Sequence, residues 1–139
     1  MNPVPLLAAL VGLSGQLQPP LVPEGIYSEA EGPTEICGIT ALEATDFIRQ
    51  VRASPHFVRA AVTDRFELYV SEQRMEQWAI TREGEPAHPA VTCRHVWQDA
   101  SGSWLLSRQM RCDASREACD RLFLEFRQLD EEMSRSLQE

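Results

Sequence analysis

The four cysteines are the side chains in this sequence whose type and spacing point most directly to chemistry. Cys37 lies in the first third of the chain, whereas Cys93, Cys112 and Cys119 follow closely on one another. An even number of cysteines in a chain of 139 residues is typical of a small disulfide-bridged domain. Because Cys112 and Cys119 flank the expected corner between a strand and a helix, we favour the pairing Cys37–Cys93 with Cys112–Cys119.

Free thiols would instead allow metal binding or nucleophilic catalysis at His88, Cys93 and His95. Thiolate and imidazole are ligands that zinc prefers, and a thiolate beside a histidine is a nucleophile. However, the sequence has no Cys-x-x-Cys knuckle, and a thiol that faces the core lacks access to substrate. We therefore predict no metal, cofactor or catalytic residue, and a zinc- or thiol-dependent hydrolase is the alternative.

Arginine, glutamate and tyrosine side chains on the expected strands form a candidate binding surface. Alternation along these strands would place them on the outer face of a sheet, where such a mixture suits a partner protein or an anionic ligand. Ordinary solvated sheet faces have the same composition. The candidate residues are Arg59, Arg65, Glu67, Tyr69, Arg94, Arg108 and Arg111.

Residues 89–112 carry the clearest strand pattern, with alternating apolar and polar residues on both sides of a glycine-containing turn. Gly102-Ser103 fits a two-residue type II′ turn, because glycine readily adopts the positive φ that the first position requires. That turn would place Cys93 opposite Cys112. The register then predicts a core face formed by Cys93, His95, Trp97, Leu106, Met110 and Cys112.

A long helix should follow this hairpin. Asp113 or Ser115 can accept a hydrogen bond from an N–H group of its first turn. Apolar residues then recur every three or four positions and form one stripe along the helix. The stripe consists of Cys119, Leu122, Phe126, Leu129 and Met133.

An earlier helix and a second hairpin complete the expected fold. Thr40 and Glu43 match a capping box at the start of that helix. Residues 65–71 and 75–82 alternate like two paired strands, whereas residues 57–62 fit either a further strand or the end of the helix. We therefore expect an α+β domain, an antiparallel sheet of about four strands in two hairpins, with the N-terminal helix and the long C-terminal helix packed on one face.

The chain before this domain contains two segments of distinctive composition. Residues 1–15 are mostly apolar and end in small residues, like a signal peptide or an apolar leader, although no basic residue precedes the apolar run. Residues 16–36 contain four prolines, which predict an extended linker. Residues 37–139 would then form a single domain, and no segment would span a membrane stably after processing.

Charge and composition limit the classes of partner. The formal net charge is −8 and no basic run is present, which argues against nucleic acid and anionic lipid as partners. All thirteen basic residues are arginine, a bias that indicates GC-rich coding in a bacterial genome. We expect an exported bacterial protein, periplasmic or secreted, that binds an envelope protein or a small ligand and is not an enzyme.

Two versions of this interpretation differ in the partner and the compartment. A protein inhibitor of an envelope hydrolase is one form of the binding role. The alternative to export is a cytosolic acidic interaction module of a dimeric, chaperone-like kind, which would have an uncleaved N-terminus and reduced thiols. No oligomeric state is predicted.

Overall fold

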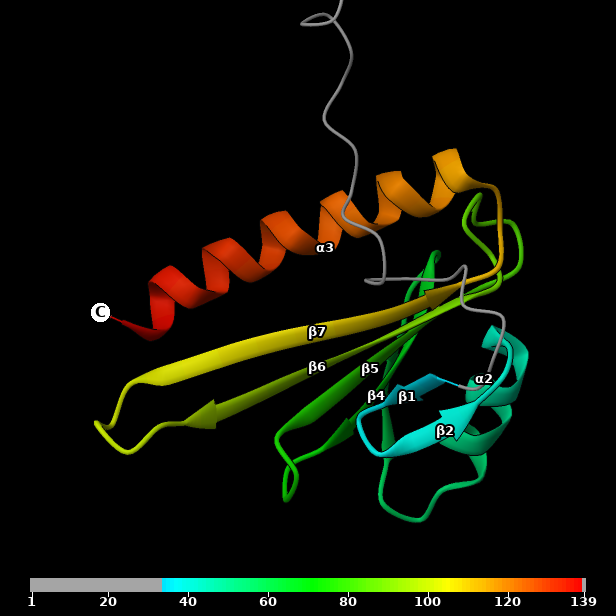
Figure 1. The fold of residues 1–139 in the computed structure, drawn as a ribbon. Coiled ribbons are helices and arrows are strands. Elements are labelled where there is room, and N and C mark those ends of the chain that lie inside the picture. Colours follow the sequence, from blue (N-terminus) through cyan, green and yellow to red (C-terminus); the bar gives the residue numbers. More distant parts are fainter. Residues whose placement is uncertain (1–33, 139) are drawn as a thin grey trace, which may run out of the picture.

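The computed structural model describes residues 34–138, which form two antiparallel sheets and two helices (Figure 1). The predicted leader, residues 1–15, and most of the predicted linker, residues 16–36, lie outside the described residues. The last three residues of that linker form the first strand. In chain order the elements are β1 (Thr34–Ile36), β2 (Ile39–Ala41), α2 (Ala44–Ala53), β3 (Val58–Val62), β4 (Phe66–Ser71), β5 (Glu76–Thr81), β6 (Ala90–Gln98), β7 (Trp104–Cys112) and α3 (Arg116–Leu137).

Five strands form the main sheet in the order β3–β4–β5–β6–β7, and each strand is antiparallel to its neighbours. β1 and β2 form a separate short hairpin. The main sheet has one strand more than predicted because β3 pairs with β4, from Val58 opposite Val70 to Val62 opposite Glu67. The predicted α+β class is confirmed.

The two helices pack on opposite faces of the main sheet, so the prediction that they share one face is wrong (Figure 1). In β5, Trp78 and Ile80 pack on the side of α2, which we call the α2 face, whereas Ala79 packs on the side of α3, the α3 face. All three side chains are buried. Consecutive buried apolar residues are typical of a strand that is covered on both faces.

Aromatic packing forms the core on the α2 face. Phe47 of α2 and Phe57 of the following loop pack on the fully buried Trp78, with ring centroids 6.3 and 6.0 Å from that of the indole. Ile36 of β1 and Ala41 of β2 are buried in or beside the same cluster. Burial of large apolar side chains contributes about 1.5–3 kcal/mol each, so hydrophobic burial holds α2 and the β1–β2 hairpin to the sheet as one layer.

α2 does not begin with the predicted capping box. Thr40 lies in β2, and the side chain of Glu43, the N-cap residue, makes no capping hydrogen bond. Asp113, which follows β7, accepts a hydrogen bond from the Ala44 N–H over 2.7 Å instead. The other oxygen of this carboxylate accepts from Arg111 Nε at 2.7 Å. A residue that lies far away in the sequence therefore caps α2.

α3 covers the other face and is capped as predicted. Ser115 Oγ accepts a hydrogen bond from the Ala118 N–H over 3.2 Å. The N-terminal half of the helix buries Leu122 and Phe126 against the α3 face. Phe66 of β4 meets Phe126 with ring centroids 5.5 Å apart.

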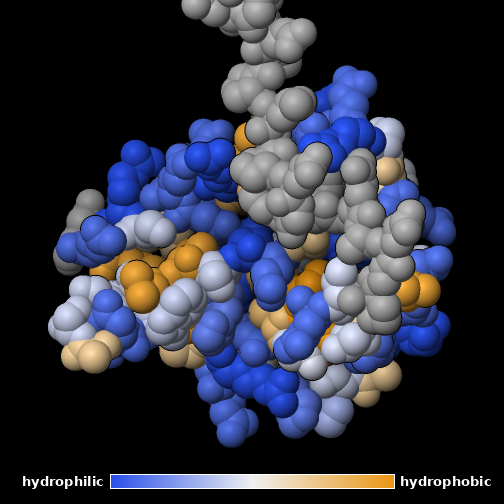
Figure 2. Space-filling model, viewed as in Figure 1, coloured by the Kyte–Doolittle hydropathy of each residue, from blue (hydrophilic) through white to orange (hydrophobic). Residues whose placement is uncertain are grey.

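The C-terminal half of α3 is less well covered and is held by an ion pair. Leu129, part of the predicted apolar stripe, is 56% exposed. Arg108 of β7 donates two hydrogen bonds to Asp130, of 2.7 and 2.8 Å, and its guanidinium lies 4.3 Å from the centre of the Phe126 ring. Figure 2 shows hydrophobic residues gathered between this half of the helix and β7, on a surface that is otherwise largely hydrophilic.

The loop between β6 and β7 is longer than the predicted two-residue turn. It runs from Asp99 to Ser103, and the Asp99 carboxylate organises it. Asp99 Oδ1 accepts hydrogen bonds from the N–H groups of Ser101 and Ser103, at 2.9 and 3.0 Å. Gly102 takes a φ of 88°, which glycine adopts without a steric penalty.

This longer loop changes the register, so the predicted core face is wrong. Cys93 pairs with Gln109, and Cys112 pairs with Ala90. Because side chains alternate along a strand, a shift by an odd number of residues moves one set of side chains to the opposite face. The six residues divide into Cys93, His95 and Trp97 on the α2 face and Leu106, Met110 and Cys112 on the α3 face.

Candidate functional site

Two disulfides fasten the outer layers to the sheet. The α2-face disulfide joins Cys37, at the β1–β2 turn, to Cys93 of β6, and the α3-face disulfide joins Cys112 of β7 to Cys119 of α3. This is the pairing favoured from the sequence, and none of the four cysteines is free. Two disulfides suggest an oxidising compartment. Among residues 34–138, no helix has both the length and the hydropathy needed to cross a membrane.

The residues of the alternative zinc or thiol site do not come together. Cys93 is bridged, so it offers neither a thiolate ligand nor a nucleophile. His88 lies in the loop after β5, and His95 stacks on Trp97 with ring centroids 5.2 Å apart. Within the described residues, one cluster of potential metal ligands is compact enough to hold an ion. It consists of Glu76 and the two sulfurs of the α2-face disulfide.

The seven residues of the predicted binding surface lie on both sides of the sheet. Arg59 is paired with Tyr69 across β3 and β4, and Tyr69 is buried on the α2 face. Arg94 is paired with Arg108 across β6 and β7, and Arg108 binds α3. Thus Arg59, Glu67, Tyr69 and Arg111 are on the α2 face, and Arg65, Arg94 and Arg108 are on the α3 side.

Three arginines of that set are also engaged within the domain. Arg65 binds Glu85 at 2.7 Å and Glu125 at 2.9 Å, and the hydrogen bonds to these carboxylates raise the pKa of Arg65. Arg108 and Arg111 are held in ion pairs whose arginine side chains are only 8% and 12% exposed. These charges therefore bind neighbouring elements of the same domain, while the Arg65 side chain remains 44% exposed.

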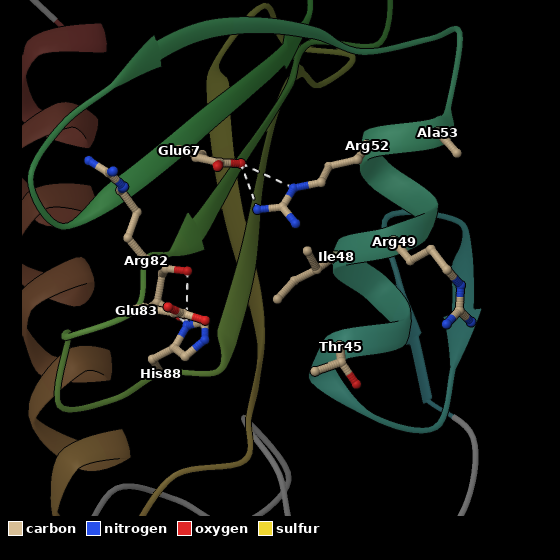
Figure 3. A pocket seen from close by; sticks show the side chains of 10 residues that line it. Thr45, Ile48, Arg49, Arg52, Ala53, Glu67, Arg82, Glu83 and His88 are labelled. Atoms are coloured by element: carbon tan, nitrogen blue, oxygen red, sulfur yellow. Dashed lines mark hydrogen bonds and ion pairs between the residues drawn. The ribbon is translucent and has the colours of Figure 1, made fainter.

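The structure instead forms a cleft of about 880 Å³ between α2 and the sheet (Figure 3). α2 forms one wall, and β4, the end of β5 and the loop that follows β5 form the other. The lining residues are Thr45, Ile48, Arg49, Arg52, Ala53, Glu67, Thr81, Arg82, Glu83 and His88.

A bridge from α2 to β4 closes one end of the cleft. Arg52 donates to Glu67 Oε2 from Nε at 3.2 Å and from Nη2 at 2.9 Å, and the Tyr69 hydroxyl donates to the same oxygen at 3.3 Å. Burial disfavours the charged guanidinium, but the hydrogen bond and charge of Glu67 outweigh burial and raise the pKa of Arg52. This end of the cleft therefore presents a guanidinium that is paired with Glu67 and whose side chain is 50% exposed.

The opposite end presents a histidine whose tautomer follows from its partners. His88 Nδ1 lies 3.0 Å from both the backbone oxygen and the hydroxyl of Thr81. That hydroxyl donates its single hydrogen to the Ala90 carbonyl at 3.1 Å and accepts from the Ala90 N–H at 2.8 Å. Because neither Thr81 oxygen has a hydrogen left to donate, Nδ1 of the neutral ring carries the hydrogen and Nε2 is the acceptor.

Figure 3 shows how these ends relate to the rest of the cleft. The Glu83 side chain lies at the same end of the cleft as His88, and Ile48 points into the space between this end and Arg52. Arg49 and Arg82 extend away from the cleft, where Arg49 binds Asp46 and Arg82 donates to a backbone oxygen. The cleft thus offers a cationic donor at one end, acceptors at the other and an apolar side chain between them.

Comparison with known protein families, curated proteins and solved structures finds no match. Function must therefore be inferred from the residues of this chain alone. Of the cleft residues, the sequence singled out only Glu67 and His88, and it assigned them to two unrelated sites. No local pattern could have joined them, because Arg52, Glu67 and His88 come from a helix, a strand and a loop.

Proposed function

We propose that this protein is an exported, non-enzymatic binding protein of the cell envelope whose α2–sheet cleft holds an amino acid or a short peptide. The observation that carries this proposal is the placement of complementary polar groups at the two ends of the cleft. Arg52 suits a carboxylate at one end, and His88 Nε2 with Glu83 suits an ammonium group at the other. Ile48 between them suits an apolar side chain.

The size and rigidity of the cleft support binding of a small ligand. A volume of about 880 Å³ lies within the range of small-molecule sites in proteins. The buried aromatic cluster holds α2 on the sheet, and the α2-face disulfide holds the adjoining β1–β2 turn, so the two walls keep a fixed spacing. A preorganised site loses less conformational entropy when its ligand binds.

The same geometry favours binding over catalysis. His88 Nε2 could act as a base, but the hydroxyl nearest to this ring, that of Thr81, donates to Ala90 and is buried. That hydroxyl therefore cannot serve as the nucleophile that a histidine would activate. Cys93 is bridged and lies on a different strand.

Export is supported by the disulfides and by the predicted leader in residues 1–15. The test is the intact mass of the protein purified from its native host, with alkylation before and after reduction. We expect a processed chain without free thiols. A full-length chain with four alkylatable thiols would contradict export.

The class of ligand is tested by titrating the ¹⁵N-labelled protein with three matched dipeptides and following its amide signals by NMR. We expect glycyl-leucine to shift the amide signals of α2 and of residues 82–89, with a Kd of about 1 mM or tighter. N-acetyl-glycyl-leucine lacks the ammonium group and glycyl-leucinamide lacks the carboxylate. Each should bind about tenfold more weakly, which corresponds to a loss of about 1.4 kcal/mol.

Variants then assign the two ends. Glu83→Gln should weaken glycyl-leucine about tenfold and leave the N-acetylated dipeptide unaffected, because only the ammonium contact is changed. Glu132→Gln, on the exposed side of α3, is the matched control and should change neither. Equal binding of all three dipeptides, signal shifts confined to other regions, or no shifts at all would refute the proposal.

A further inference from the structure

The two disulfides lie in different environments. Three of the four cysteines are at most 1% exposed, namely Cys93, Cys112 and Cys119. Cys37 is only partly buried, because it occupies the β1–β2 turn, where it adopts a φ of 45°. An external thiol can therefore approach the α2-face disulfide from the side of Cys37, whereas neither sulfur of the α3-face disulfide is accessible in the folded chain.

A carboxylate accompanies the accessible disulfide. Glu76 begins β5, and one of its oxygens and the sulfurs of Cys37 and Cys93 lie within 4.8 Å of one another. Glu76 Oε2 is buried and has no hydrogen-bond partner. Burial raises the pKa of Glu76, and the opposing charges are those of Arg74, His95 and His56. When this carboxyl group is protonated, its proton lies close to the two sulfurs.

We propose that the α2-face disulfide is a site of thiol–disulfide exchange, at which an external thiol attacks Cys37 Sγ and Glu76 protonates Cys93 Sγ. Attack in line with the S–S bond forms a mixed disulfide between the thiol and Cys37. The electron pair of the broken bond passes to Cys93 Sγ, which takes the proton of Glu76. A second thiol group then releases Cys37 as a thiol, so that two thiols are oxidised to one disulfide while the protein gains two.

The role of Glu76 follows from the burial of the leaving group. Cys93 is 1% exposed and packs among apolar side chains, where a thiolate is strongly disfavoured. Exchange is faster when the leaving thiolate is stabilised. Transfer of a proton as the bond breaks removes the charge altogether, and Glu76 is the acid placed to do this. Reduction would release the β1–β2 turn from β6. The exchange chemistry does not depend on which ligand occupies the cleft.

The test treats the folded full-length protein with dithiothreitol, followed by acid quenching, alkylation and peptide mass mapping. We expect Cys37 and Cys93 to be alkylated first, while the α3-face disulfide stays closed and serves as an internal control. If reduction required global unfolding, both disulfides would open together. Simultaneous opening of the two disulfides would therefore overturn the proposal.

Glu76→Gln isolates the proton transfer, with Glu72→Gln, an exposed turn residue, as the matched control. The rate constant per attacking thiolate should fall roughly tenfold or more in Glu76→Gln and stay unchanged in Glu72→Gln. In the wild-type protein, the same rate constant should also fall as pH rises and Glu76 loses its proton. This second test requires no variant. A rate constant that is independent of both pH and Glu76 would refute the role of Glu76.

Discussion

The buried Arg108–Asp130 pair should be the most sensitive polar contact in the domain. Their side chains are only 8% and 14% exposed, and they share two hydrogen bonds of 2.7 and 2.8 Å. Asp130→Asn removes the negative charge while keeping the shape. It would leave Arg108 buried without its counter-charge and beside Arg94, whose pKa is lowered by burial and by the charge of Arg108.

The expected cost is large compared with the stability of a small domain. Removal of one partner from a buried ion pair costs about 3–5 kcal/mol, and the whole domain is stabilised by about 5–15 kcal/mol. Asp130→Asn should fall near the lower end, because the carboxamide oxygen still accepts one hydrogen bond. Urea unfolding with both disulfides intact, followed by circular dichroism, gives the change in the free energy of unfolding.

Two comparison variants separate the buried charge from surface electrostatics. Glu131, the residue after Asp130, forms an exposed ion pair with Arg127, and the side chains of Arg127 and Glu131 are 59% and 63% exposed. Glu131→Gln should therefore cost less than about 1 kcal/mol. The double variant Arg108→Met/Asp130→Leu removes both charges and should recover most of the loss. The reasoning is refuted if Asp130→Asn costs no more than Glu131→Gln.

The location of the pair also predicts where the domain loosens. The α3-face disulfide anchors the start of α3, and Asp130 anchors its second half. Amide hydrogen exchange in Asp130→Asn should therefore accelerate in residues 127–137 and stay unchanged at the start of the helix. Uniform acceleration along the whole helix would show that the pair does not act locally.

Four further tests address other contacts of the fold. Asp113→Ala should destabilise the domain by about 1–2 kcal/mol, because the Ala44 N–H loses its cap, and exchange at that amide should rise. Replacement of both cysteines of the α2-face disulfide by serine should cost about 4 kcal/mol of stability, against about 2.5 kcal/mol for the α3-face disulfide, because the sequence separations are 56 and 7. Urea unfolding measures both losses. Equal losses would contradict the loop-entropy model. Hydrogen bonds that Arg65 donates to Glu85 lower the pKa of Glu85. The contact between them therefore stabilises the fold above the unfolded-state pKa of about 4.3, and this stabilisation is lost as pH falls through the lower folded-state pKa. Glu85→Gln should therefore destabilise by less than about 1 kcal/mol near pH 7 and have no effect below the folded-state pKa. Burial raises the pKa of Glu76, so the ionised Glu76 carboxylate destabilises the fold, opposite to Glu85. Glu76→Gln should therefore increase the free energy of unfolding near neutral pH but not at low pH. A decrease near neutral pH would contradict this.

Local signals in the sequence predicted local structure well. Ser115 caps α3 because its hydroxyl meets an N–H three residues away, a contact that depends on neighbouring residues alone. The capping box at Thr40 and Glu43 failed although the motif was present. The chain at Thr40 pairs in β2, and Asp113 supplies the cap from another part of the fold. Tertiary contacts of this kind are not encoded in any short window.

The placement of the helices required information that alternation does not contain. β5 has buried residues on both faces, and Trp78 and Ala79 serve different cores. Alternation of apolar and polar residues distinguishes the two faces of a strand but does not show which helix covers each face. The cleft was equally hidden, because it exists only where α2 crosses the α2 face and meets the loop after β5.

The register of the β6–β7 hairpin explains why the cysteines have one possible pairing. With a two-residue turn, Cys93 and Cys112 would lie side by side on one face, and a bridge between them would compete with the observed pairs. The Asp99 loop shifts the register and sends these two side chains to opposite faces of the sheet. Cys93 can then reach only Cys37 in the α2 layer, and Cys112 can reach only a cysteine on α3. A single carboxylate in a loop thus determines which outer layer each disulfide fastens to the sheet, the β1–β2 turn or α3.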